Sequence, residues 1–92
     1  MKLPKAINIG PHRIPIKRVK SLHTTAEAYG LFDPNTMEIL IDAGTTDSHQ
    51  LEVLFHEIIE AANTMYEMGL DHRNIQTIGV VLAQVFNDLE AP

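Results

Sequence analysis

The sequence contains no cysteine and no tryptophan, and only a few aromatic residues. Without cysteine there is neither a disulfide framework nor a thiolate metal site, so a bound metal would have to be held by His, Glu or Asp. No apolar run approaches the roughly 18 residues of a membrane span. No apolar stretch follows Lys2 and Lys5, as it would in a signal peptide. We therefore expect a cytoplasmic protein that makes no use of a membrane.

Basic residues are scarce beyond the first twenty positions. From Glu27 onward the twelve acidic residues face a single base, Arg73, and the net charge of the chain is −5. This acidic balance argues against a dedicated nucleic-acid-binding protein. The length of 92 residues suffices for one modest core. We expect a single domain over residues 1–92, with a β-rich part over 1–45 and a pair of helices over 46–92.

Two strands are predicted near the N-terminus. Residues 6–9 can form the first strand, and Gly10 and Pro11 mark a turn. Residues 12–19 then alternate between apolar and polar side chains, which is the period of a half-buried strand. Because Pro15 cannot donate a ladder hydrogen bond, we expect this second strand to lie at a sheet edge or to be bulged.

A β-hairpin is predicted over residues 29–42. Runs 29–32 and 37–42 flank the segment Asp33-Pro34-Asn35-Thr36, whose residue types fit a type I turn. Ile39 and Ile41 would share one face of the second run, and we expect the helices to cover that face. We also expect the run 37–42 to be an exposed edge strand.

Two helices are predicted in the C-terminal half. Asp47 with Gln50 can form a capping box, an apolar stripe of 3.6-residue period follows, and Gly69 can supply the left-handed residue that ends the helix. Asp71 can cap a second helix, which places His72 in its first turn. With only Leu70 between Gly69 and that cap, the two helices must turn back on each other tightly and run antiparallel.

The first of these helices carries the sequence His56-Glu57-Ile58-Ile59-Glu60. Residues four apart on a helix lie on the same face, so one ion can contact both His56 and Glu60. Glu57 would lie beside that ion, about 100° further round the helix. This is the layout of the zinc-hydrolase helix H-E-x-x-H with a glutamate in place of the second histidine. By the 100° rule, His56 and Glu60 also point away from the main apolar stripe.

A third ligand is available just beyond the helix bend. His56, Glu60 and His72 together would provide two imidazoles and one carboxylate, a set that supports zinc hydrolysis when a fourth position stays open. We therefore predict one zinc ion at these three residues. An edge strand beside the site would let an extended peptide bind by β-addition.

The chain resembles small phage and bacterial zincin-like proteins, which are compact relatives of the SprT-like and ImmA/IrrE-type metallopeptidases. The resemblance lies in the run Leu54–Asn63 and in the hairpin before it, which contains Tyr29-Gly-Leu in its first strand and Ile-Leu-Ile-Asp42 in its second. The resemblance spans about residues 29 to 88. It implies that His56 is a zinc ligand, that Glu57 activates water for peptide hydrolysis, and that Glu60 stands where the family has its second histidine. It also implies that His72 matches the third histidine, which SprT-like proteins place beyond the motif helix. The partner would be a peptide or protein.

Two other enzyme classes also use carboxylates on helices, and the sequence departs from the pattern of each. Glu57 and Glu60 match the first E-x-x-E of all-α NTP pyrophosphatases, but no acidic residue lies between Asp71 and Asp88 to supply the second pair. A di-iron bundle needs E-x-x-H pairs on four helices. A catalytically inactive zincin-like protein, or a metal-free acidic module that binds a protein and is encoded by a phage, is the non-enzymatic alternative. The sequence does not set the oligomeric state, although an exposed edge strand would allow dimerisation.

Overall fold

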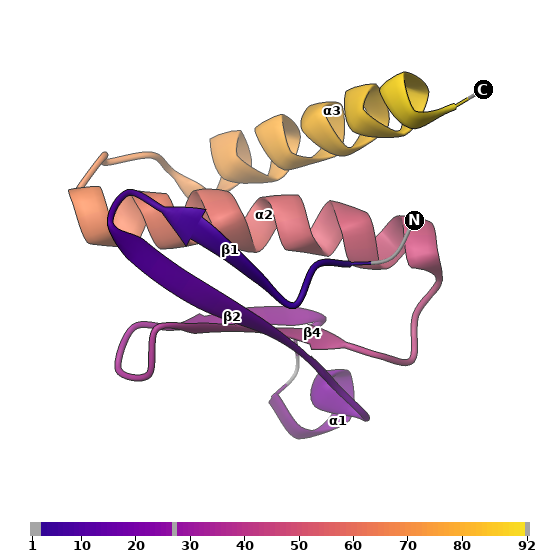
Figure 1. The fold of residues 1–92 in the computed structure, drawn as a ribbon, viewed down its shortest axis with the longest axis horizontal. Helices are drawn as coiled ribbons and strands as arrows, with labels where there is room; N and C mark the ends of the chain where they lie inside the picture. The colour runs from indigo at the N-terminus through magenta and orange to yellow at the C-terminus, as the bar shows by residue number, and fades with distance from the viewer. Residues whose placement is uncertain (1–2, 27, 92) are drawn as a thin grey trace.

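The computed structural model of the chain describes residues 3–26 and 28–91. Its main elements form three layers: a four-stranded sheet, helix α2 (Asp47–Tyr66) against the sheet, and helix α3 (His72–Glu90) on the far side of α2 (Figure 1). The predicted α+β class, with strands first and an antiparallel helical pair after them, is confirmed. Within the described residues, no helix combines the length and apolar character needed to cross a membrane.

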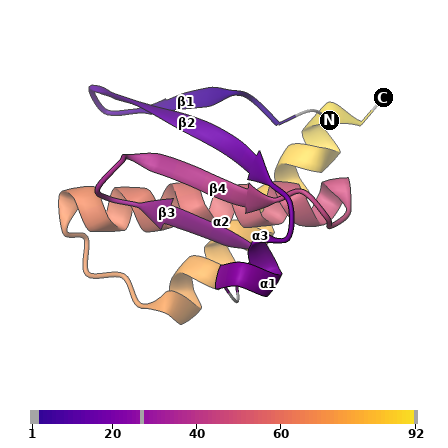
Figure 2. The ribbon, with the colours of Figure 1, turned by 90° about the horizontal axis from the view of Figure 1, so that it is seen from below.

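The sheet contains β1 (Ala6–Ile9), β2 (His12–Val19), β3 (Gly30–Asp33) and β4 (Glu38–Asp42), in the order β1-β2-β4-β3 (Figure 2). Its β1–β2 and β3–β4 pairs are antiparallel, as the predicted turns require. The β2–β4 pair is parallel, which the sequence patterns did not indicate. Parallel neighbours need a connection longer than a hairpin, and here it includes the short helix α1 (Leu22–Ala26).

The prediction that Pro15 marks an edge or bulged strand is wrong, because β2 is an inner strand. The structure shows how proline is accommodated there. Ile16 donates its N–H to the Lys5 carbonyl on the β1 side, at 2.9 Å. Successive N–H groups point to opposite sides of a strand, so position 15 would donate toward β4. Pairing with β4 begins only at Ile16, and no ladder hydrogen bond is lost at Pro15.

The predicted hairpin forms, but its edge was assigned to the wrong strand. Asp33 organises the turn: its carboxylate accepts a hydrogen bond from Asn35 N–H at 2.8 Å, and its carbonyl accepts one from Met37 N–H at 2.8 Å. The second strand, β4, lies inside the sheet between β2 and β3. Its partner β3 is therefore the exposed edge on that side, and it is β3 that approaches the candidate site.

The core lies between the sheet and α2, as expected for the isoleucine face of the hairpin. Ile14, Ile39 and Ile41 are fully buried and pack in one cluster with Leu54 and Ala61 of α2. Burying each such aliphatic side chain contributes roughly 1.5–3 kcal/mol relative to leaving it in water. This cluster holds α2 in place along the sheet.

Helix α2 begins at Asp47, one residue earlier than predicted. Thr46, not Asp47, is the N-cap, and its hydroxyl accepts a hydrogen bond from His49 N–H at 3.2 Å. Gln50 does not close a capping box; its buried side chain donates to the Thr45 carbonyl at 2.9 Å. At the other end, Glu67 takes the left-handed conformation expected of Gly69, although Gly69 is left-handed too, two residues later.

Helix α3 begins as predicted. Asp71 is its N-cap and accepts a hydrogen bond from Asn74 N–H at 2.9 Å, so that His72 is the first residue of the helix. The helix packs closely on α2 through Gly79: a Cβ atom at that position would lie 3.2 Å from the backbone nitrogen of His56. A side chain at this position would require the two helices to move apart by a few tenths of an ångström.

Candidate metal centre

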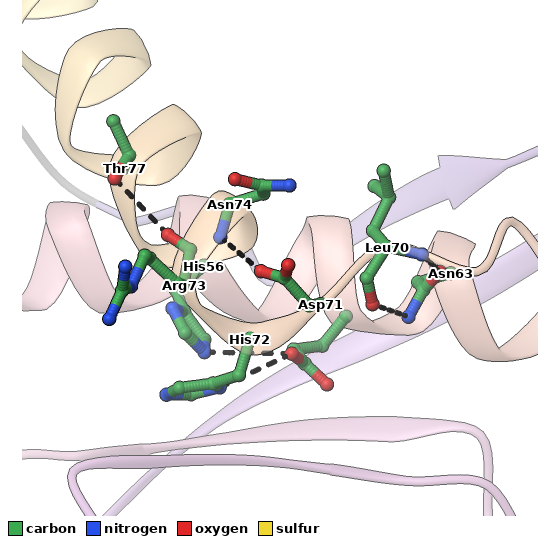
Figure 3. A network of polar contacts seen from close by, with 9 residues as sticks. His56, Asn63, Leu70, Asp71, His72, Arg73, Asn74 and Thr77 are labelled. Atoms are coloured by element: carbon green, nitrogen blue, oxygen red, sulfur yellow. Dashed lines mark hydrogen bonds and ion pairs between the residues drawn. The ribbon is translucent and has the colours of Figure 1, made fainter.

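The structure brings His56, Glu60 and His72 together. Nε2 of His56 lies 3.9 Å from Oε1 of Glu60, and Nδ1 of His72 lies 3.7 Å from the same oxygen. One ligand atom from each residue lies within 4.8 Å of the other two. Figure 3 shows the two imidazoles beside each other at this point, with His56 coming from α2 and His72 from the start of α3.

These distances can be compared with the needs of a tetrahedral zinc site. Zinc bonds of about 2.0–2.1 Å place neighbouring ligand atoms roughly 3.3 Å apart. The side-chain atoms therefore need to close by less than about 1.5 Å to satisfy that geometry. Rotation of the exposed His72 side chain, 77% accessible, can supply this movement without a change in the backbone. The donor set, two nitrogens and one carboxylate oxygen, is one that zinc accepts.

His72 reaches the site because the turn between the helices is fastened to α2. The Asn63 side chain donates to the Leu70 carbonyl at 3.2 Å and accepts from Leu70 N–H at 2.9 Å (Figure 3). These two hydrogen bonds to the backbone of one residue fix both the position and the orientation of the segment. Asp71 then starts α3 directly after this anchored residue. Asn63 was not predicted to contribute, since only the position of Leu70 in space gives its amide a role.

The side of α2 that carries His56 is covered by α3 and does not face open water. Its side chain is only 14% exposed, because α3 covers this side of α2. Burial lowers the pKa of His56, with Glu60 acting in the opposite direction and His72 in the same one. A neutral imidazole is the form that binds a metal.

The other ring nitrogen of His56, Nδ1, is buried and has no hydrogen-bond partner among the described residues. Metal-binding histidines normally donate this second N–H to an acceptor. The Gln76 side chain, one turn after His72, interacts with the same imidazole and raises its pKa.

Glu57 lies on the sheet side of α2 and is 8% exposed. Burial raises the pKa of Glu57 to about 7; the neighbouring Glu60 carboxylate also raises it, and a hydrogen bond from the Phe32 N–H lowers it. A carboxyl group that titrates near neutral pH is suited to general-base catalysis. Gly30 makes room for it: a Cβ there would lie 2.9 Å from Cγ of Glu57 and 2.4 Å from Cγ1 of Val53.

Two cavities of about 290 and 230 Å³ adjoin this centre. They share Gly30, His56, Glu57 and His72, so that one lies on each side of the ligand set along the edge strand β3. The Phe32 N–H points away from β4 and toward this side, while the Tyr29 carbonyl accepts from Asp42 N–H at 2.8 Å within the sheet. Because backbone groups alternate along a strand, those of Gly30 also point outward, toward the cavities.

The side chains of Tyr29, His49 and Tyr66 are chemically able to donate a hydrogen bond to a developing oxyanion. Tyr29 and His49 line the larger cavity with His56 and Glu57, and their rings make an edge contact with centroids 4.8 Å apart. Tyr66 lines neither cavity; it lies against Gly10, at the turn between β1 and β2. Of the three, only Tyr29 and His49 are placed where a bound substrate could contact them.

In comparisons with known proteins, no family model, no curated protein and no solved structure matches the chain. The resemblance to zincin-like proteins is therefore untested by relatives. The function has to be argued from the geometry.

Proposed function

We propose that this chain is a zinc-dependent, zincin-like peptidase domain, with zinc held by His56, Glu60 and His72. The observation that carries the proposal is the convergence of these three side chains within 4.8 Å, beside a buried Glu57. The turn anchored at Asn63 and Leu70 supports the proposal, because it brings His72 from another helix to the pair formed by His56 and Glu60.

Zinc bound there would acidify a water molecule and polarise the carbonyl group to be cleaved. The residues of the chain would do the rest. Glu57, with a pKa of about 7, would accept a proton from the water and return it to the leaving amine. The Phe32 N–H would hold the Glu57 carboxylate in position, and the sheet beneath it would keep bulk water away from this side of the base.

A peptide in extended conformation is the substrate class that the surroundings favour. The outward backbone groups of Gly30 offer hydrogen bonds to an added strand, as edge strands do in β-addition. The cavities on both sides of the ligand set would receive side chains before and after the cleaved bond. Because the shared residues include the base and two ligands, the cleaved bond would lie over the centre itself.

Hydrolysis by zinc-loaded protein tests this proposal. A library of fluorogenic peptides should be cleaved by the wild type and not by the Glu57→Gln variant, while that variant keeps its zinc. Glu52→Gln is the matched control, since Glu52 lines the larger cavity on the same helix but is not in the ligand set. Unchanged hydrolysis by Glu57→Gln would exclude Glu57 as the base. A protein that takes up zinc but cleaves nothing would fit the inactive alternative.

A further inference from the structure

Helix α3 carries two apolar faces, of which only one is packed. Ile75, Gly79 and Ala83 follow each other at intervals of four residues and are buried against α2. A second set runs along the side of the helix and remains in water: Ile78, Leu82, Val85 and Leu89, with Val81 beside them. Their exposed fractions are 41%, 42%, 47%, 79% and 52%, respectively. We call these five residues the outer face of α3.

The spacing within the outer face is that of a helix–helix seam. Ile78, Leu82, Val85 and Leu89 are separated by four, three and four residues, the alternation by which paired helices interlock their side chains. Asp88 is the only charged residue at the border of the outer face, and the uncharged Asn74 lies on the same side of the helix, one turn before Ile78. Arg73, Gln76 and Asn87 lie on the opposite side. A solvated helix face would normally carry charges at such positions.

We infer that the outer face binds a second copy of this chain, with the two α3 helices antiparallel about a two-fold axis. The same apolar stripe on both partners is what an isologous interface requires. Five aliphatic residues exposed to this degree present on the order of 400 Å². Two copies with flanking contacts would then bury close to the roughly 1,000 Å² expected of a specific interface.

Charge and register favour the antiparallel arrangement over the parallel one. A parallel pair would place Asp88 next to Asp88 of its partner and would align the two helix dipoles in the same direction. In an antiparallel pair with Ile78 opposite Leu89, Leu82 falls opposite Val85, so every seam residue meets an apolar partner. The two Asp88 carboxylates are then separated by several turns of helix.

The proposed interface leaves the candidate metal centre open. None of the five outer-face residues lines either cavity at that centre. Dimerisation through α3 therefore neither requires zinc nor blocks a substrate, and it stands independently of the proposed peptidase function.

Sedimentation velocity on the metal-free wild-type chain tests the inference. At about 100 μM we expect a species of twice the 10.3 kDa chain mass. Val85→Glu and, separately, Leu89→Glu should weaken association at least about tenfold, because each buries a charge in the seam. Asn87→Glu is the control, because the exposed Asn87 lies on the side of α3 opposite the outer face, and it should leave association unchanged. Far-UV circular dichroism confirms that each variant is folded.

The double variant Leu82→Lys/Val85→Glu tests the register. In the antiparallel pair each new cation faces a new anion of the partner, so association should recover relative to Val85→Glu alone. A parallel pair would oppose like charges and would associate less. Wild-type chain that is monomeric at this concentration, equal association of Val85→Glu and Asn87→Glu, or no recovery in the double variant would each overturn the inference. A monomeric wild-type chain would indicate instead that the outer face of α3 binds a different protein.

Discussion

Helix α2 is packed on two sides, and its two interfaces are built differently. Toward the sheet, Leu54 and Ala61 belong to a continuous cluster with the buried strand isoleucines. Toward α3, close approach depends on small residues, and Ile75 is the one large aliphatic side chain of α3 that is buried. The candidate site draws on both: Glu57 lies on the sheet side, while His56 lies on the α3 side and His72 comes from α3 itself. Neither interface alone assembles it.

Loss of the Ile75 side chain should disrupt the α2–α3 interface. Of the changes predicted below, it should lower the free energy of unfolding the most. Ile75 is 1% exposed, and its replacement by Ala should lower the free energy of unfolding by about 2–5 kcal/mol. Val80 provides the control on the same helix: it is 40% exposed and not part of the outer face, so Val80→Ala should change stability by less than about 1 kcal/mol. Urea denaturation measures both. Equal losses would show that α3 is not held on α2 as described.

The burial of Glu57 on the sheet side of α2 can be tested through the pH dependence of the free energy of unfolding of metal-free protein. Burial raises the pKa of Glu57 to about 7 from its ordinary value of 4.5, so the folded state binds a proton more tightly than the unfolded state does. Protonated Glu57 therefore contributes to the free energy of unfolding. This contribution is fully present below about pH 4.5 and is lost as pH rises through 7, by up to about 3 kcal/mol.

Glu57→Gln should remove this component. The difference in unfolding free energy between wild type and variant, measured by denaturation from pH 4 to 8, should then grow in favour of the variant as pH rises. A difference that stays constant over that range would contradict the buried position of the Glu57 carboxyl group.

Replacement of Gly79 should alter only the spacing between α2 and α3 and should leave the interface between α2 and the sheet unchanged. Gly79→Leu would place a side chain against the His56 backbone, with an expected loss of about 1–3 kcal/mol and about tenfold weaker zinc binding. Gly69→Ala is the matched control. Gly69 has a φ of +72° and open space around it, so its substitution should cost about 1 kcal/mol through backbone strain without moving α3 from α2. Zinc affinity reduced equally in both variants would show that spacing is not the cause.

Local patterns predicted much of this architecture, and nonlocal contacts account for what they missed. Asp71 and His72 could be placed because a cap and a helix start depend on adjacent residues, and His56 and Glu60 because their spacing is a property of one helix. The inner position of β2 could not be inferred from Pro15, since it depends on where pairing with β4 begins. The roles of Asn63 and Gln76 depend on how α3 returns along α2. For Glu57, burial follows from the approach of Gly30 and Phe32 on β3, a strand that had not been recognised as the edge.

The most direct test of the central claim is a zinc titration of chelator-treated protein by isothermal calorimetry, with metal content checked by mass spectrometry. We expect about one zinc per chain. His56→Ala and His72→Ala should lose or greatly weaken that site. His49→Ala is the matched control, since it changes a histidine on the same face of α2 outside the ligand set and should bind zinc like the wild type. No zinc uptake by the wild type, or equal uptake by His56→Ala and His49→Ala, would contradict a metal centre at His56, Glu60 and His72.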